Sequence, residues 1–373
     1  MGKRIGIIGV GAVGGYTGAH MARAGEDVTF IDMWPAHVDE MKRNGLRITH
    51  HEGDEPFTVK VRALHLTEAQ HLSKEAPIDI AFVCTKSYDT QWAVMLISQY
   101  LAPGGYVVSL QNCMNEATVA EVVGWGKVMG CIASNISVGL VEPGHVHRGG
   151  LKGGAAHTVY RTGEVHGTIT ERAHEVCRLV AHADSAKVTD NLWGERWSKL
   201  VANTMANGVS ACTGLPGAQL AQSAPIRHFQ ARLGSEAIRI GQTLGYRLEE
   251  IGHLPPETIA RAGEGNAEAL AQYDAHRLGG RRGSAEQRPS MGQGEAHRDR
   301  VSERLCRPRR REGRHRGARQ CAARRHRQKG RARRAQAGPA PHHRTPAELV
   351  QGWWRQGDKA RLAGLARIRR AQK

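Results

Sequence analysis

The chain has 373 residues and a formal net charge of +18, from 53 Lys and Arg against 35 Asp and Glu. This length is enough for two domains of ordinary size, each with its own core. The charge is concentrated at one end, because residues 294–373 hold 25 Lys and Arg against 6 Asp and Glu. The first 293 residues are therefore nearly neutral, and the overall charge by itself indicates no anionic partner for them.

Cysteine spacing and hydropathy exclude several protein classes. The seven cysteines include no CxxC pair, so neither a disulfide framework nor a metal site is predicted. The N-terminus runs directly into a buried-strand pattern without an apolar targeting segment, and no apolar stretch of about 18 residues follows. These features predict a soluble, cytoplasmic protein with no membrane span.

The first elements in chain order form a βαβ unit. An apolar run at 4–9 ends in glycine, residues 12–24 have a helical pattern, and a second apolar run follows at 27–31. Strands with this spacing are joined by a right-handed crossover and lie parallel. Further strands are predicted at 78–84 and 105–110, and weaker ones at 132–141 and 157–160.

The sequence thus predicts an α/β fold with three parts. Residues 1–185 form a Rossmann-type doubly wound sheet. Residues 186–293 form a second, all-helical domain for substrate binding and dimerisation, because apolar residues recur there at three- and four-residue intervals, as in Trp193, Trp197 and Val201. Residues 294–373 are a basic tail without apolar periodicity, for which disorder is expected.

A glycine-rich turn after the first strand predicts a dinucleotide site. It comprises Gly9, Gly11, Ala12, Val13 and Gly14, with Val10 between the first two glycines. The first glycine permits the tight turn, the second lets the backbone approach a pyrophosphate, and the third packs the helix against the strand. The helix N-terminus then favours the phosphate charge.

Asp32 ends the second strand, 18 residues after Gly14. A carboxylate there can accept hydrogen bonds from the adenosine ribose and would repel a 2'-phosphate, which favours NAD over NADP. Nearby Lys42, Arg43 and Lys86 could compensate that charge. The alternative interpretation of Asp32 is a helix N-cap ahead of Pro35.

A polar helix face is predicted in the second domain. Lys199, Asn203 and Asn207 lie at i, i+4 and i+8, opposite the tryptophans. A lysine ammonium beside a carbonyl oxygen stabilises a developing alkoxide and can protonate it. The alternative is a solvated face of a surface helix.

With these residues in place, the chain resembles the ketopantoate reductase family over residues 4 to about 293. The resemblance rests on the glycine turn, on Val-Cys-Thr-Lys at 83–86, on Leu-Gln-Asn-Cys-Met-Asn at 110–115, and on Leu-Trp-Gly-Glu-Arg-Trp-Ser-Lys-Leu-Val-Ala-Asn at 192–203. It implies that Lys199 is the catalytic acid, that Lys86 lies near the cofactor, and that Asn112 lies near both nicotinamide and substrate. It also implies that Ser290 binds the substrate carboxylate.

The sequence departs from the family pattern in three places. Cys113 replaces the family's usual glycine, and Asp32 stands where the usual members prefer a basic or neutral environment for NADP. The family's late glutamate block is absent at 294–306. Read one nucleotide later, one allowed codon choice for that stretch gives A-K-P-T-E-I-E-F-L-N-G-F-V, and a similar reading of 320–339 gives an amphipathic helix. The tail is therefore interpreted as out of frame, with a native nucleic-acid-binding arm as the alternative.

The predicted function is NAD(P)H-dependent reduction of a small 2-keto acid, 2-dehydropantoate to (R)-pantoate, in pantothenate biosynthesis. Lys199 is the predicted acid, and the substrate is bound by Asn112, Asn203, Asn207 and Ser290. One alternative is an NAD-dependent D-2-hydroxyacid dehydrogenase. Another is a catalytically impaired pseudoenzyme with a nucleic-acid-binding tail. A homodimer is possible, and no membrane partner is expected.

Overall fold

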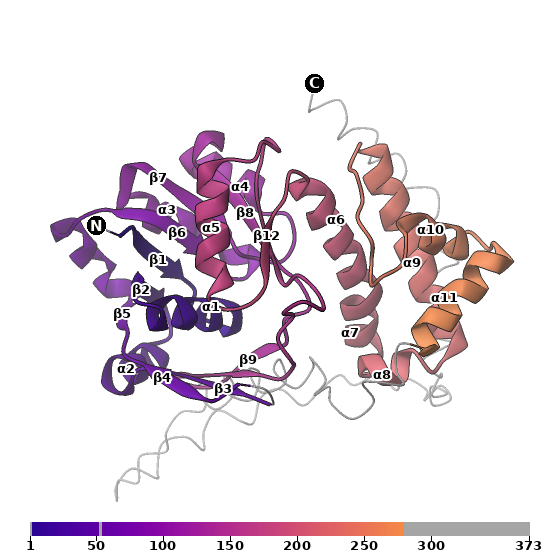
Figure 1. Ribbon diagram of the computed structural model, residues 1–373, viewed down its shortest axis with the longest axis horizontal. Coiled ribbons are helices and arrows are strands. Elements are labelled where there is room, and N and C mark those ends of the chain that lie inside the picture. The colour runs from indigo at the N-terminus through magenta and orange to yellow at the C-terminus, as the bar shows by residue number, and fades with distance from the viewer. Residues whose placement is uncertain (1, 52–53, 280–373) are drawn as a thin grey trace, which may run out of the picture. The chain divides into compact units, whose positions relative to one another are not determined.

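An eight-stranded sheet forms the centre of the N-terminal part of the computed structural model, which describes residues 2–51 and 54–279 (Figure 1). Its strand order is β5, β2, β1, β6, β7, β8, β11, β12. The first six are parallel, β11 runs antiparallel to β8, and β12 is parallel to β11. The strands span Arg4–Ile8 (β1), Asp27–Asp32 (β2), Arg62–His65 (β5), Ile78–Val83 (β6), Leu101–Ser109 (β7), Val128–Ala133 (β8), Tyr160–Glu164 (β11) and Ala186–Val188 (β12). The predicted Rossmann-type architecture is confirmed.

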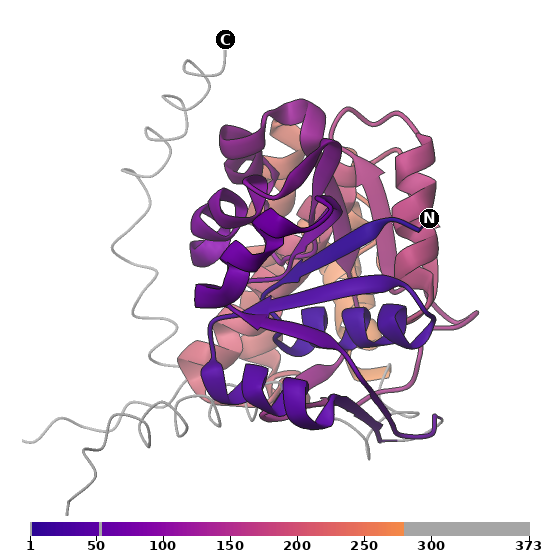
Figure 2. The ribbon, with the colours of Figure 1, turned by 90° about the vertical axis from the view of Figure 1, so that its left-hand side faces the viewer.

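Helices cover both faces of this sheet, as Figure 2 shows from the side. Alternate residues of β1 point to opposite faces, so Ile7 packs in the core under α1 and α5, whereas Ile8 packs in the core under α3 and α4. The helices of this part span Ala12–Arg23 (α1), Pro35–Asn44 (α2), Thr90–Ser98 (α3), Glu116–Val123 (α4) and Glu171–Ala181 (α5), with short 3-10 segments at Leu66–Lys74 (η1), Ser87–Asp89 (η2) and Trp125–Lys127 (η3).

A second, four-stranded sheet packs against α1. Its order is β4, β3, β10, β9, with bounds Leu46–His50 (β3), Phe57–Val59 (β4), Val138–Glu142 (β9) and His145–Arg148 (β10). Buried Leu46, Ile48 and Val146 extend the core that includes Tyr16 of α1. This sheet was not predicted from the sequence.

Two predicted strands differ from the structure. The single strand expected at 132–141 is wrong, because residues 134–137 separate β8 from β9, and these strands belong to different sheets. Asn135 has φ +54°, a left-handed conformation that interrupts an extended chain. The strand expected at 157–160 overlaps β11 only at Tyr160. In addition, β12 carries the sheet three residues past the boundary expected at 185.

The rest of the described chain is helical. Its longest helix, α9, packs against α10, α11 and α6 around a core that contains Val201, Met205, Ile238 and Tyr273. The elements span Leu192–Asn203 (α6), Thr204–Gly208 (η4, a π-helical turn), Val209–Thr213 (α7), Gly217–Leu220 (α8), Ala224–Thr243 (α9), Pro256–Gly263 (α10) and Ala267–Gly279 (α11).

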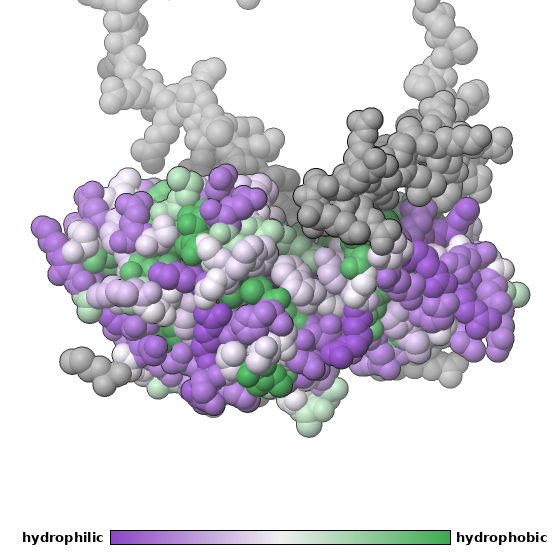
Figure 3. Space-filling view, turned by 90° about the horizontal axis from the view of Figure 1, so that it is seen from above, coloured by the Kyte–Doolittle hydropathy of each residue, from purple (hydrophilic) through white to green (hydrophobic). Residues whose placement is uncertain are grey.

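The surface of the described residues is mixed in character. Figure 3 shows mainly hydrophilic residues on one face, with hydrophobic ones in separate small groups. Within the residues that the structure describes, no helix has the length and apolar character needed to cross a membrane. Ser290 and the tail at 294–373 lie outside the described residues.

Candidate active site

The turn between β1 and α1 needs glycine at two positions. Gly9 has φ +89°, and a Cβ atom there would lie 2.8 Å from the backbone nitrogen of Thr85. A Cβ atom on Gly14 would lie 2.4 Å from the carbonyl oxygen of Gly9 and 2.8 Å from Cβ of Cys84. Both distances are too short for a side chain, so the tight approach of β1, α1 and the end of β6 depends on these glycines.

The N-terminus of α1 fits a dinucleotide phosphate. The helix begins at Ala12, and Gly11 precedes it with extended backbone. Within this described segment no side chain caps the first turn, and the turn has no acidic residue. Its N–H groups and the positive end of the helix dipole therefore favour an anion. Val13 is partly buried in this turn.

Asp32 holds backbone on both sides of the end of β2. Its Oδ2 accepts a hydrogen bond from the N–H of Val10 at 2.7 Å, and its Oδ1 accepts one from the N–H of Trp34 at 2.9 Å. The second contact supports the start of α2. The N-cap residue of α2 is Trp34, so the N-cap interpretation of Asp32 is wrong. Each carboxylate oxygen can accept more than one hydrogen bond, so the ribose-binding role stays compatible with this geometry.

Two of the three cations expected to offset Asp32 have carboxylate partners. Lys42 Nζ lies 2.6 Å from Glu68 Oε2, and Arg43 Nη1 lies 3.6 Å from Glu40 Oε2. Lys86 is exposed and immediately precedes η2, just after β6. To bind a 2'-phosphate, Lys42 and Arg43 would have to weaken or break these ion pairs.

The segment after β7 is held by side-chain amides. Gln111 Nε2 donates hydrogen bonds to the carbonyl oxygen of Thr85 and to Oγ1 of Thr90, each at 2.9 Å. Asn115 Nδ2 donates to the carbonyl oxygen of Asn112 at 2.7 Å. These contacts fix the backbone of Asn112 and leave its side chain exposed.

Cys113, one of the departures from the family pattern, has an unusual backbone conformation. Its φ is +67°, in the left-handed region that favours glycine, and its side chain is exposed. A glycine would adopt this backbone conformation without strain, whereas a cysteine adopts it at some cost.

Lys199 on α6 reaches the end of β8. Its ammonium donates a hydrogen bond to the carbonyl oxygen of Ala133. Burial lowers the pKa of Lys199 to about 7, and the nearby positive charge of Arg196 acts in the same direction. A lysine in this state can carry and release a proton near neutral pH.

The other two residues of the predicted polar face follow Lys199. Asn203, partly buried, ends α6, and Asn207, exposed, lies in the π-helical turn at Thr204–Gly208. Such turns occur frequently at functional sites.

The candidate residues line one edge of the large sheet. The carboxyl end of β1 leads into the glycine turn, that of β6 into Lys86, and that of β7 into Asn112. The neighbouring strand β8 ends at Ala133, which binds Lys199. Strands β1, β6, β7 and β8 are adjacent and parallel. Ligands of open parallel sheets bind at this edge.

A buried ion pair was not predicted. Arg196 is 2% exposed and lies 2.5 Å from Oε1 of Glu116, which is fully buried. Its guanidinium also donates to the carbonyl oxygens of Gln111 at 2.6 Å and Ser109 at 2.7 Å. The sequence signal for this ion pair was the position of Arg196, which lies four residues after Leu192 and therefore on the same, buried side of α6.

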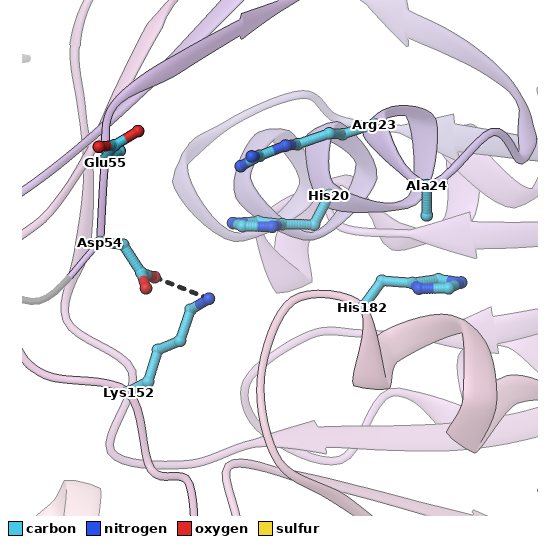
Figure 4. A pocket seen from close by; sticks show the side chains of 7 residues that line it. All are labelled: His20, Arg23, Ala24, Asp54, Glu55, Lys152 and His182. Atoms are coloured by element: carbon cyan, nitrogen blue, oxygen red, sulfur yellow. Dashed lines mark ion pairs between the residues drawn. The ribbon is translucent and has the colours of Figure 1, made fainter.

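A cavity of about 520 Å³ lies elsewhere, beside the C-terminal half of α1. His20 and Arg23 extend from α1 toward the Asp54–Lys152 ion pair (Figure 4). None of the predicted site residues that the structure describes lines this cavity. In the described part of the chain, no cluster of His, Cys, Asp and Glu side chains could hold a metal ion.

Two family models match the chain. The model described as Ketopantoate reductase PanE/ApbA matches residues 5–157, and the model described as Ketopantoate reductase PanE/ApbA C terminal matches residues 191–300. The two matches cover well over half of the chain and include every predicted site residue.

Individual relatives and solved structures are also similar to this chain. The 2-dehydropantoate 2-reductase of Pyrococcus abyssi is 30% identical over 208 residues, 55% of this chain, and the match spans 63% of that relative's length. The solved PanE/ApbA family ketopantoate reductase from Ralstonia eutropha JMP134 is 25% identical, with a TM-score of 0.58, and the match covers 82% of this chain and 93% of that one. A D-mandelate dehydrogenase solved with NADH and anilino(oxo)acetate has a TM-score of 0.59 at 20% identity, covering 70% and 80%, which shows a common fold.

Proposed function

Since the chain belongs to the ketopantoate reductase family, we propose that it reduces the keto group of a small 2-keto acid with a nicotinamide dinucleotide. The proposed substrate is 2-dehydropantoate, and the product is (R)-pantoate. The matches to 2-dehydropantoate 2-reductases and the row of polar residues at the carboxyl edge of the sheet support this proposal.

The observation that carries the proposal is Lys199. A partly buried ammonium with a pKa of about 7, hydrogen-bonded at the carboxyl end of β8, is suited to protonating an oxygen at this edge. An ordinary surface lysine would keep its proton near neutral pH. The burial of Lys199 therefore changes its acidity as well as its packing.

The proposed reaction divides the work between the cofactor and the chain. The bound nicotinamide would supply the hydride. Lys199 stabilises negative charge on the substrate's keto oxygen and then donates its proton there. Asn112 and Asn203 orient the keto acid through amide hydrogen bonds. We assign its carboxylate to Asn207 and Ser290, of which Ser290 lies outside the described residues.

Substitution of Lys199 tests the proposal. Lys199→Met keeps an apolar stem and removes the ammonium, so kcat for reduction of 2-dehydropantoate should fall at least about a hundredfold, the usual size of acid catalysis. Cofactor affinity, measured by nicotinamide fluorescence, should change much less. The matched control is Lys74→Met, at an exposed lysine that ends η1. A variant with the parent's turnover would contradict the assignment of Lys199.

Asp32 favours a second candidate, an NAD-dependent D-2-hydroxyacid dehydrogenase. Its carboxylate opposes a 2'-phosphate, and two nearby cations, Lys42 and Arg43, are paired with glutamates. We expect NADH to bind more tightly than NADPH, and Asp32→Asn to narrow the difference. A tenfold preference for NADPH would contradict this role.

A comparison of reduction rates for 2-dehydropantoate and for bulkier 2-keto acids separates the two functions. Cofactor binding without turnover of any of these acids would favour the pseudoenzyme.

A further inference from the structure

His37 of α2 connects the cofactor turn to the small sheet. The side chain is fully buried. Its Nε2 lies 2.9 Å from the carbonyl oxygen of Val10, between the first two glycines of the turn, and its Nδ1 lies 2.8 Å from the backbone nitrogen of Gly144, between β9 and β10. His37 and Gly144 are 107 positions apart in the sequence.

The two contacts fix the tautomer of His37. A backbone N–H can only donate, so Nδ1 must accept the hydrogen bond from Gly144. In a neutral imidazole the proton is then on Nε2, which donates to the carbonyl oxygen of Val10. Burial lowers the pKa of His37, although the negative charge of Asp32 acts in the opposite direction, and the neutral form agrees with this direction.

Val10 is therefore held at both of its backbone polar groups. Asp32 accepts a hydrogen bond from its N–H at 2.7 Å, and His37 donates one to its carbonyl oxygen at 2.9 Å. Both side chains come from the β2–α2 unit. The two contacts set the orientation of the peptide groups on either side of Val10, and so the path of the chain into the N-terminus of α1.

The other end of the connection is also fixed. Gly144 has φ +71°, and a Cβ atom there would lie 2.5 Å from Cγ of Glu40, so the turn between β9 and β10 packs closely on α2. In addition, the ring of His37 stacks on Trp34, with centroids 5.8 Å apart and planes at 25°. The imidazole consequently has little freedom to leave the turn.

We propose that His37 is a positioning residue for the cofactor, which pre-forms the dinucleotide-binding turn through Val10 and anchors it to the small sheet through Gly144. The inference deepens the proposed function and rests on its cofactor site. The contact with Gly144 holds the imidazole in place, and the bond to Val10 is the one that acts on the cofactor turn. A turn already in its bound shape binds a ligand without the cost of ordering it.

Three substitutions separate the two hydrogen bonds. His37→Gln places an amide N–H near Nε2 and can still donate to Val10. His37→Asn places an acceptor near Nδ1 and keeps only the bond from Gly144, and His37→Leu keeps neither. We expect all three to lower the Tm, because each leaves a buried polar group unpaired.

The three His37 variants should rank differently in NADH affinity than in Tm. His37→Leu and His37→Asn should weaken NADH binding by about five- to tenfold, the effect of one hydrogen bond, whereas His37→Gln should stay within about twofold of the parent. In the two weakened variants the KM for the cofactor should rise more than kcat falls. His71→Leu, at an exposed histidine of η1, is the control.

Two results would overturn the inference. One is unchanged NADH affinity in His37→Leu. The other is an affinity that falls in step with Tm across all three variants, which is the behaviour of a purely structural residue. A parent chain that binds neither NADH nor NADPH would overturn the proposed function as well, so failure of the inference alone is recognised by normal binding in the parent.

Discussion

Lys199 carries the chemistry at the scale of single residues. Its pKa of about 7 lies far below the ordinary value of a lysine, chiefly because the ammonium is buried. An acid must hold its proton before it can donate it, so the reactive form of Lys199 exists below this pKa. The direction of the shift thereby sets the direction of the pH dependence.

We expect the rate of keto-acid reduction at saturating cofactor to be level below about pH 6 and to fall above about pH 7. A single proton acid gives a fall of about tenfold per pH unit. Oxidation of the hydroxy acid should show the reverse dependence, because it needs the unprotonated amine. Rates measured between pH 5.5 and 9.5 test this, and a level profile up to pH 9 would contradict the assignment.

At the scale of elements, Arg196 joins α6 to the end of β7. Its guanidinium binds two carbonyl oxygens of the segment that leads to Asn112, and it lies one helical turn before Lys199. Glu116, at the start of α4, neutralises it in the interior. Two proposed site residues on different elements are in this way held by one buried ion pair.

Removing the arginine should affect both stability and chemistry. Arg196→Met leaves Glu116 buried without a counter-charge, so the free energy of unfolding should fall by about 3–5 kcal/mol. Adding Glu116→Gln should recover part of that loss, since the uncompensated charge is gone. Where the chain folds, the alkaline limb of the rate profile should move to higher pH, because Arg196 helps to lower the pKa of Lys199.

Chemical denaturation of the single and double variants, with the pH profile of the double variant, tests this connection. Arg196→Lys is the conservative comparison, since it keeps the charge and loses the guanidinium fork. An Arg196→Met variant as stable as the parent would show that the ion pair contributes nothing net. An unmoved alkaline limb in the double variant would show that the arginine does not influence Lys199.

At the scale of the whole molecule, the charge divides the chain into a nearly neutral part and a strongly basic one. Residues 294–373 hold 25 of the 53 Lys and Arg, and they lie outside the described residues. The family match reaches residue 300, where the expected glutamate block is absent. Restoring the frame read one nucleotide later should return that block and its carboxylate.

We expect the reframed chain, with T-E-I-E-F-L-N-G in place of residues 297–304, to reduce 2-dehydropantoate faster than the present chain. The reason is that the resemblance assigns a substrate-binding role to the block's glutamate. Changing that glutamate to glutamine in the reframed chain is the matched control. Equal turnover before and after reframing, together with salt-sensitive binding of nucleic acid by the present chain, would support a native basic arm instead.

The sequence by itself determined the features that depend on local pattern. The glycine turn, its strand and its helix lie within 24 residues and are set by side-chain size and apolar periodicity, and the structure confirms them. The helix that carries Lys199 and Asn203 was recognised in the same way. These features need only neighbouring residues for their recognition.

Only the tertiary structure decided how distant segments meet. The hydrogen bonds from Arg196 to Ser109 and from Gly144 to His37 join residues 87 and 107 positions apart, and no local pattern encodes such partners. The depressed pKa of Lys199 likewise requires burial by other elements. The break between β8 and β9 has the same origin, because two apolar runs in sequence joined different sheets. Periodicity shows which face of an element is buried, but the element that buries it is chosen by packing of the whole chain.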